Sequence, residues 1–381
     1  MLSAVALLVA LSGVVAAWPT RTPTVDAGVL RDRILASAGV AHQGYAVSVG
    51  ALGLPPLPQL GQVASLLSST TQMRTWYGAR DRWRVDVIDT GSERGFYQTP
   101  DGQYTWDFAA NQLTHIAPPV PRFVVLDGAG EFEVSGGTVE PPVRLPRAAD
   151  LLPPDLARRL LAAAAGDRVE SIPGRRVAGI AAAGLRIVPA DPHSTVGHID
   201  IWADPRTGLP LQVEASARGA ERPVLVTRFL EVGMTAPGAG VLTPPTAREE
   251  VSVTVARVSQ GIDELLPRAG TASLPDRLAG LPRQRAAVDE VEGPDLVGVY
   301  GTGLTRIAVL PLSRRIGPDV YKRIAAWGQT FSVPAGNGAM ISTSLLSVLV
   351  VQADRRTYLA AGMVDAEFLR QVGVELAGGR G

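Results

Sequence analysis

The sequence predicts an α+β protein in which a large antiparallel sheet carries helices against one face and a smaller α+β domain follows. Hydrophobic residues make up 46% of the 381 residues and charged residues 19%, which supplies enough apolar mass for folded cores and excludes a disordered chain. The first two thirds of the chain follow the order helix, strands, helix, strands. A Pro- and Gly-rich stretch over 237–245 then predicts a domain boundary.

The first 17 residues are apolar and carry no charge. Small residues at 15–17 suit signal-peptidase cleavage, and the stretch is just short of a bilayer-spanning helix. We therefore expect a signal peptide or an N-terminal membrane anchor with a linker over 1–24. The rest of the chain is expected outside the cytoplasm, in the cell envelope, either membrane-anchored or secreted.

A first domain is predicted over 25–245, and its first half begins with a helix. Asp26 can cap a helix that runs to about residue 38 and stops at Gly39. A strand over 42–51 and a short amphipathic segment over 59–67 follow. Apolar runs separated by turn residues then predict a meander with strands at 73–77, 83–88, 96–99 and 104–108.

Alternation along the second of these strands predicts that the sheet has two different faces. It places Trp83, Val85 and Val87 on one side. Arg82, Arg84 and Asp86 fall on the other side, so we expect one apolar face and one solvent-exposed face.

The second half of this domain repeats the pattern. After an irregular Pro- and Gly-rich stretch over 117–153, a helix is predicted over 154–165, because prolines open it and Gly166 ends it. Strand-like runs follow at 176–188, 196–202, 209–217 and 224–231, and a tight turn over 204–208 joins the middle two.

A smaller α+β domain is predicted over 246–381. Two apolar runs at 296–300 and 306–310 flank Gly301 and Gly303 and predict a hairpin. Beyond it we expect a helix over 319–327, strands within 339–351 and 356–362, and a last helix over 365–376.

Composition excludes several kinds of chemistry. The chain has no cysteine, which removes disulfides, thiolate metal sites and cysteine nucleophiles. Basic and acidic residues balance at 36 each, so no net field attracts nucleic acid. No nucleotide-binding or hydrolase motif occurs. The acidic pairs Asp86 with Asp89 and Glu249 with Glu250 are expected to be solvated surface. We expect no cofactor, no bound metal and no enzyme activity.

One polar cluster leaves an alternative of another class open. Asp191, His193, His198 and Asp200 are the only grouping of histidines with carboxylates, and a hairpin could bring them together. This alternative is a metal-dependent hydrolase, although a polar loop leading into a strand is the simpler interpretation.

What remains is apolar and favours a binding protein. Three tryptophans lie in the first meander, beside a leucine- and proline-rich flap over 52–67. A curved sheet with a partly filled hollow side could bury acyl chains there at about 0.8 kcal/mol per methylene. The candidate cavity residues are Leu54, Leu57, Leu60, Leu66, Trp76, Trp83, Val85, Trp106 and Trp202.

Several segments resemble a known family. YAVSV from Tyr45, TWYGARDRWRVD from Thr75 and YTWD from Tyr104 resemble the first half of LolA/RseB-type periplasmic domains. The second meander is similar in RVAG from Arg176, LRIVP from Leu185 and IDIWADPRTGLPLQV from Ile199, which includes the D-x-x-T-G-L-P turn. VYGTGLTRIAVL from Val299 resembles the smaller C-terminal domain of the MucB/RseB sigma-E regulators. The resemblance covers 25–245 and, more loosely, 285–375.

The resemblance implies an open antiparallel β half-barrel with helices in its concavity. It also implies a lipid or an acylated protein as ligand, and the extracytoplasmic part of an anti-sigma factor as partner of an envelope-stress regulator. A LolA-like carrier of lipoprotein or lipid is the alternative within the binding class. A carrier must diffuse, so its leader would be cleaved, whereas a regulator can stay at the membrane through its N-terminal segment. The scarcity of lysine indicates a GC-rich genome of actinobacterial type.

Overall fold

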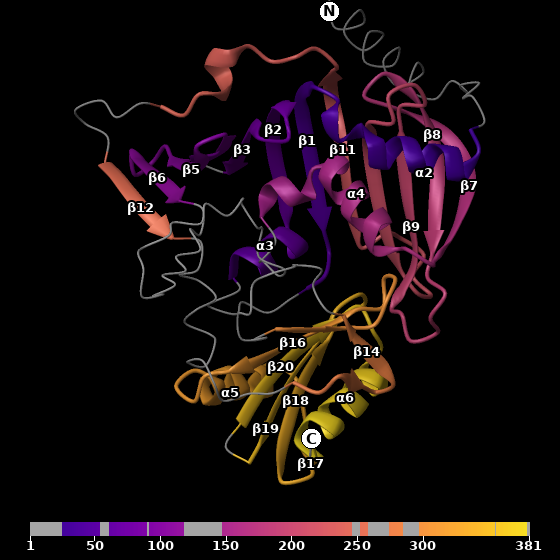
Figure 1. The fold of residues 1–381 in the computed structure, drawn as a ribbon, viewed down its shortest axis with the longest axis vertical. Helices are drawn as coiled ribbons and strands as arrows, with labels where there is room; N and C mark the ends of the chain where they lie inside the picture. Colours follow the sequence, from indigo (N-terminus) through magenta and orange to yellow (C-terminus); the bar gives the residue numbers. More distant parts are fainter. Residues whose placement is uncertain are drawn as a thin grey trace, which may run out of the picture.

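Two β-sheets form the framework of the protein. The computed structural model describes residues 25–53, 61–89, 91–117, 147–245, 252–257, 274–284, 297–354 and 356–378. The first sheet has 12 strands in the order β12-β6-β5-β4-β3-β2-β1-β11-β10-β9-β8-β7, and the second has eight in the order β13-β14-β15-β16-β20-β19-β18-β17. Figure 1 shows the second sheet, coloured orange to yellow, below the first. Both sheets are open, because their end strands do not pair with each other.

The first half of the first sheet is a meander preceded by a helix, as predicted. Helix α2 (Ala27–Ala36) begins where the Asp26 carboxylate accepts hydrogen bonds from the amides of Gly28 and Val29. A single 3₁₀ turn (Ser37–Gly39) leads into the sheet. The elements that follow are β1 (His42–Gly50), α3 (Gly61–Ser68), β2 (Thr70–Ala79), β3 (Arg82–Asp89), β4 (Ser92–Thr99), β5 (Gly102–Asp107) and β6 (Gln112–Ala117).

A second helix and a second meander complete the domain. The 3₁₀ turn η2 (Ala148–Leu151) runs into α4 (Pro153–Ala163), which has proline in its first turn. The strands are β7 (Arg168–Val177), β8 (Ile180–Val188), β9 (Val196–Ala203), β10 (Pro210–Ala217) and β11 (Leu225–Gly233). Pairing of β1 with β11 joins the two meanders into one antiparallel sheet.

One face of this sheet, which we call the α4 face, packs against helices. Leu30 and Ile34 of α2 and Leu161 of α4 are buried among inward-facing residues of β8, β9 and β10, such as Ile187 and Ile201. Strand pairing shows which residues of β11, β1, β2 and β3 lie on this same face. Met73 of β2, for example, is paired with Ala46 of β1 and with Val87 of β3. Alternation along β3 is therefore as predicted.

The turn between β9 and β10 adopts the predicted tight geometry. The Asp204 carboxylate accepts hydrogen bonds from the Arg206 amide and the Thr207 hydroxyl at 3.1 and 2.9 Å. Gly208 has φ of 73° and lies directly against the Arg33 carbonyl of α2, so a side chain here would be strained and would collide with that helix.

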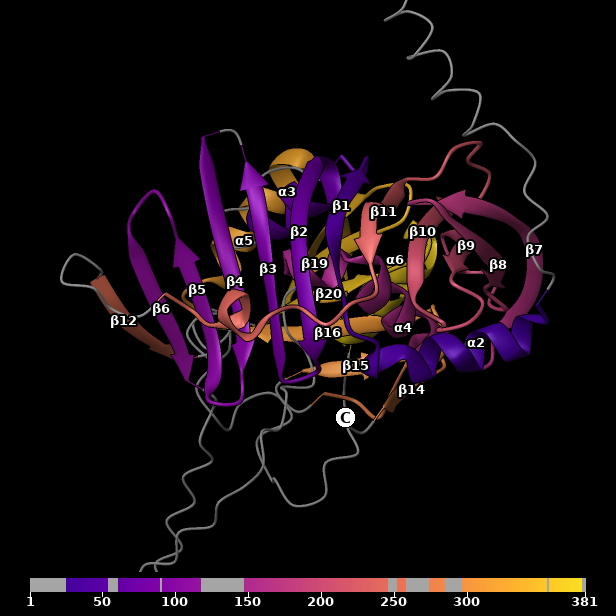
Figure 2. The ribbon, with the colours of Figure 1, turned by 90° about the horizontal axis from the view of Figure 1, so that it is seen from above.

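Several strands differ from the sequence prediction, and two of these differences change the first sheet. The run 176–188 is not one strand but the end of β7, a turn at Ala178 and Gly179, and β8. Strand β12 (Ser252–Arg257) lies within the range predicted for the second domain, yet it pairs in parallel with β6 at the far edge of the first sheet (Figure 2). Between β11 and β12, the chain crosses the face opposite to the α4 face, where the 3₁₀ turn η3 (Ala239–Leu242) contacts β2 and β3.

The second domain has three layers. Its strands are β13 (Arg277–Leu278), β14 (Leu281–Gln284), β15 (Gly298–Tyr300), β16 (Ile307–Leu312), β17 (Gln329–Val333), β18 (Gly336–Ser342), β19 (Ser347–Ala353) and β20 (Arg356–Gly362). Helix α5 (Gly317–Trp327) packs on Val348 and Val350, whereas α6 (Ala366–Gly378) packs on Leu349 and Val351. Because neighbouring residues of a strand face opposite ways, the two helices cover opposite faces (Figure 1). The predicted hairpin of β15 with β16 and both predicted helices are present.

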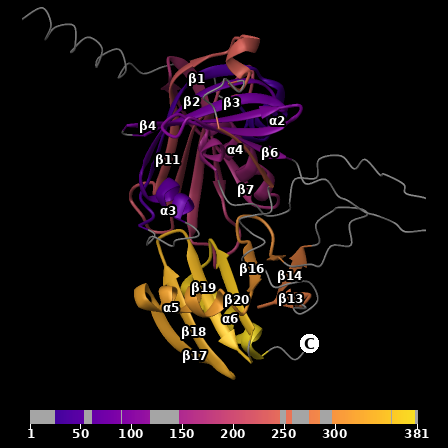
Figure 3. The ribbon, with the colours of Figure 1, turned by 90° about the vertical axis from the view of Figure 1, so that its left-hand side faces the viewer.

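A short joint connects the domains. The Thr195 amide donates to the Met363 carbonyl at 3.0 Å, and the Asp365 amide donates to the His193 carbonyl at 2.9 Å. Leu304 and Leu345 of the second domain are buried in the apolar cluster of the first. Figure 3 shows the two domains meeting at this end of the first sheet. Among the described residues, no helix combines the length and the apolarity needed to cross a bilayer.

Candidate functional site

An apolar surface on the α4 face, next to α3, is the candidate ligand site. Val85 and Met73 are buried there together with Leu151 and Phe229, and Leu66, Trp83 and Val87 pack against them while staying partly exposed. Phe96 of β4 is paired with Val85, lies on the same face and is also half-buried. Helices α2 and α4 contact β7, β8, β10 and β11, which lie nearer the other end of the sheet. Apolar side chains on β3 and β4 thus keep surface that a ligand could cover.

Helix α3 is held against β1 by its end. The Leu52 amide donates to the Leu67 carbonyl at 3.1 Å, and the Gly50 amide donates to the Ser69 carbonyl at 3.0 Å. Gly50 touches the Leu67 backbone so closely that a Cβ atom could not fit between them. The helix of the predicted flap therefore lies beside the half-buried residues of the α4 face.

A buried polar row crosses the same face. Ser48 of β1 is paired with Thr71 of β2 and with Thr227 of β11, and all three are buried. The Thr227 hydroxyl donates to the Leu151 carbonyl at 2.7 Å. The Ser48 hydroxyl has no hydrogen-bond partner within the described part of the chain. A buried hydroxyl without a partner is unusual, and because Ser48 is 0% exposed it offers a ligand no surface.

The nine predicted cavity residues are not gathered in one place. Three of them, Leu66, Trp83 and Val85, belong to the apolar cluster of the α4 face. Three others, Leu54, Leu57 and Leu60, lie outside the described residues. The remaining three, Trp76, Trp106 and Trp202, are on the opposite face, since they pair with Arg84, Gly95 and Gln212 respectively.

The opposite face was expected to be solvent-exposed, but around β3 it is covered. The Arg84 guanidinium forms two hydrogen bonds with the Asp86 carboxylate, at 2.7 and 2.5 Å, and lies between the rings of Trp76 and Tyr97. Asp86 is only 1% exposed. The crossing chain also contacts this ion pair, because the Val241 carbonyl accepts a hydrogen bond from Arg84.

Burial there changes the acidity of two groups. It raises the pKa of Tyr97 to about 12. The pKa of the Glu93 carboxyl is raised by burial first and by its hydrogen bond with Asp86 second. Alternation along β3 revealed which face Asp86 occupies, but no sequence signal revealed that Val241, 157 positions after Arg84, contacts this ion pair.

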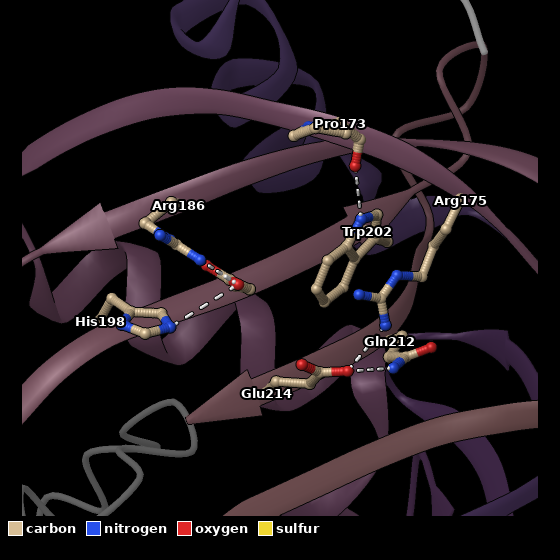
Figure 4. Close-up of polar contacts among 8 residues, drawn as sticks. Pro173, Arg175, Arg186, His198, Trp202, Gln212 and Glu214 are labelled. Carbon is tan, nitrogen blue, oxygen red and sulfur yellow. Dashed lines mark hydrogen bonds and ion pairs between the residues drawn. The ribbon is translucent and has the colours of Figure 1, made fainter. Parts of the chain in front are cut away.

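Trp202 is a structural residue. Its indole donates to the Pro173 carbonyl at 3.1 Å, and the Arg175 guanidinium lies 3.5 Å from the ring centre (Figure 4). Arg175 is itself paired with Glu214 at 2.8 Å. Trp202 is 2% exposed, so it has almost no surface to offer a ligand.

The four residues of the hydrolase alternative separate into two pairs. Asp200 accepts two hydrogen bonds from Arg186 at 2.6 and 2.7 Å, with His198 3.8 Å away (Figure 4). Asp191 instead accepts a hydrogen bond from the His193 amide at 2.8 Å, and the His193 ring pairs with Asp365, the residue before α6, at 2.9 Å. In the part of the chain that the structure describes, no three His, Asp or Glu side chains converge on a possible metal position.

Comparison with known proteins finds similarity only among solved structures. No protein-family model matches the chain, and no curated protein matches it. The MucB protein of Pseudomonas aeruginosa, solved in complex with MucA, aligns over 92% of this chain and 98% of its own at 17% identity, with a TM-score of 0.47. This chain is therefore similar to MucB along most of its length.

Two smaller proteins align with part of the chain. A LolA superfamily protein from Nitrosomonas europaea covers 58% of this chain and 99% of its own at 10% identity, with a TM-score of 0.22. A domain from Vibrio parahaemolyticus described as outer membrane lipoprotein-sorting covers 57% of this chain and 96% of its own at 12% identity, with a TM-score of 0.22. The predicted MucB/RseB and LolA resemblance is thus found again among solved structures.

Proposed function

We propose that this chain is a non-enzymatic envelope protein that binds the acyl chain of a lipid or an acylated protein on the α4 face beside α3. The supporting observation is the half-buried apolar surface of Leu66, Trp83, Val87 and Phe96, which continues a buried core and lies on β3, β4 and α3. An acyl chain lying on these side chains would gain about 0.8 kcal/mol for each buried methylene.

The role that we propose for this binding is regulatory. The sequence resemblance is to two-domain sigma-E regulators, and MucB has been solved with MucA as its partner. By that analogy, the extracytoplasmic part of an anti-sigma factor is the proposed protein partner, and the N-terminal segment is the proposed membrane attachment. A LolA-like lipid carrier is the second candidate, and a mature chain that starts near Trp18 would favour it.

The two tryptophans of neighbouring strands provide a matched test. Trp83 is on the α4 face and Trp76 is on the opposite face, and both are half-buried. Delipidated protein should take up a fluorescent fatty acid, and Trp83→Ala should weaken this binding about tenfold, because it removes a large part of the apolar contact. Trp76→Ala should leave the affinity nearly unchanged.

Two results would contradict the proposed ligand site. The wild-type protein could fail to take up the fatty acid, or both tryptophan variants could bind it equally well. Titration with the extracytoplasmic segment of an anti-sigma factor from the same genome tests the partner separately, by calorimetry with and without bound lipid.

A further inference from the structure

Helix α5 presents an unusual surface on the second domain. Its inner side packs through Ile324 on the sheet. Its outer side consists of exposed residues at helical spacing, which are Pro318, Asp319, Lys322, Arg323, Ala326 and Trp327. Trp327 is 68% exposed, whereas Trp106 and Trp202 are buried. A large aromatic side chain left this exposed calls for a covering partner.

Four cations lie on α5 or in the turn before it. Lys322 and Arg323 lie on the same side of α5, and Arg323 is one helical turn before Trp327. Arg314 and Arg315 are exposed in the turn that leads into the helix. The acidic Asp319 is the one carboxylate on this side of the helix.

These cations are unpaired, in contrast to arginines elsewhere. Among the described residues, none of Arg314, Arg315, Lys322 and Arg323 forms a salt bridge. The first sheet instead pairs its arginines with carboxylates, as in Arg84 with Asp86, Arg175 with Glu214 and Arg186 with Asp200. In a chain with equal numbers of acids and bases, such a patch is a local excess of positive charge.

Helix α6, which covers the other face of this sheet, differs from α5 in its charge. The exposed residues of α6 include Glu367 and Glu375, and Arg370 is neutralised by Glu367 at 3.3 Å. Because α5 and α6 cover opposite faces of the sheet, the domain has a basic side and an acidic side. This asymmetry would orient the domain at a negatively charged surface.

We propose that the outer side of α5 docks on an anionic lipid bilayer. Trp327 would lie among the headgroups, where the indole ring is favoured, and Lys322, Arg323, Arg314 and Arg315 would contact lipid phosphates. Helix α5 is about 16 Å long at 1.5 Å per residue, so it can lie flat along the surface. This contact is separate from the N-terminal segment and from the ligand site on the α4 face.

The test uses the full chain with phosphatidylcholine vesicles, with and without phosphatidylglycerol. Residues 1–17 carry no charged side chain, so their insertion should depend little on lipid charge. Binding through α5 should be about tenfold stronger with phosphatidylglycerol, and the difference should shrink at high salt. Lys322→Glu with Arg323→Glu should abolish the difference, whereas the control pair Arg82→Glu with Arg222→Glu, on exposed sites of the first domain, should retain it.

Two further measurements report on α5 itself. The blue shift of tryptophan emission that depends on phosphatidylglycerol should be absent in Trp327→Phe. Lys322 is the only lysine of the chain, so vesicles should protect it from an amine-reactive reagent in the wild-type protein without any substitution. The protection assay stays informative even if a charge-reversed α5 fails to fold.

Three outcomes would overturn the proposal. The first is equal binding to both kinds of vesicle, and the second is an unprotected Lys322. The third is binding of polyglutamate, but not of vesicles, that is lost on charge reversal, which would assign the patch to an acidic protein partner.

Discussion

The buried ion pair of Arg84 and Asp86 illustrates how a single residue depends on a distant segment. Asp86 is buried and pairs with the Arg84 guanidinium, and burial of an isolated carboxylate is costly. The crossing chain reaches this pair through Arg84, whose guanidinium donates to the Val241 carbonyl. Removal of the Arg84 guanidinium would therefore leave the buried Asp86 carboxylate without its partner.

Arg84→Met should destabilise the protein by about 3–5 kcal/mol, because Asp86 would lose its partner while staying buried. Urea unfolding followed by circular dichroism measures the change. Arg94→Met is the matched control, since Arg94 pairs with Asp107 in an exposed position and should matter little. Equal losses in the two variants would contradict the role assigned to burial.

His42 should make stability depend on pH. Burial lowers the pKa of its imidazole, which stacks on Tyr77 with ring centres 5.0 Å apart. The folded state thus favours the neutral ring, so its contribution is complete above the ordinary histidine pKa of about 6.5 and is lost as the pH falls below that value. Urea unfolding at pH 7.5 and 5.5 should show a smaller decline in His42→Phe than in the wild-type protein. An identical decline would exclude His42 as its source.

At the scale of single elements, hairpin turns show a local conflict between sequence and backbone. Pro334 and Ala335 connect β17 to β18, and Ala335 has φ of 59°. Proline followed by a residue with positive φ is the pattern of a type II turn, which favours glycine at the second position. An alanine there is strained by its Cβ atom.

Ala335→Gly should therefore raise the free energy of unfolding by up to about 1 kcal/mol, after the added flexibility of the unfolded chain is subtracted. The same substitution at the exposed position Ala326, within α5, should lower it by about 1 kcal/mol. Thermal unfolding compares the two variants directly. The prediction is wrong if both shift stability in the same direction.

Local signals explain which elements the sequence could predict. The Asp26 cap, the alternation in β3 and the turn at Asp204 are short-range features, and each predicted its element. Strand β7 was missed because its turn uses Ala178 at φ of 49°, which no turn signature marks. Strand β12 was missed because its partner, β6, lies about 140 positions earlier in the chain.

The candidate site was predicted in part for the same reason. Alternation within β3 identified Trp83 and Val85 as facing one way. Assignment of Trp76 to the same face required the register between β2 and β3, which includes a shift near Ala79. Periodicity in one strand cannot give that register, because it is set by the turn and by pairing across the sheet.

At the scale of the whole molecule, the joint decides whether the domains unfold together. Its backbone bonds around Thr195 and Asp365 are few, and the apolar contribution comes from Leu304 and Leu345. The Asp167 carboxylate adds a hydrogen bond from the Leu304 amide at 3.0 Å. An interface this small can couple two domains only while its apolar side chains stay buried.

Leu304→Ala with Leu345→Ala should split thermal unfolding into two transitions, because each domain keeps its own core while the coupling is lost. Differential scanning calorimetry measures this directly. Val374→Ala, at an exposed position on α6, should retain the wild-type profile. A single transition in the double variant would mean that the domains are coupled elsewhere.

The parallel pairing of β12 with β6 has a consequence for shortened forms of the protein. A fragment that ends at residue 245 would contain every other strand of the first sheet, yet the free hydrogen-bonding groups of β6 would face water. An exposed edge strand of this kind can pair with strands of neighbouring molecules. Proteolysis after the crossing chain would thus produce a self-associating species instead of an independent first domain.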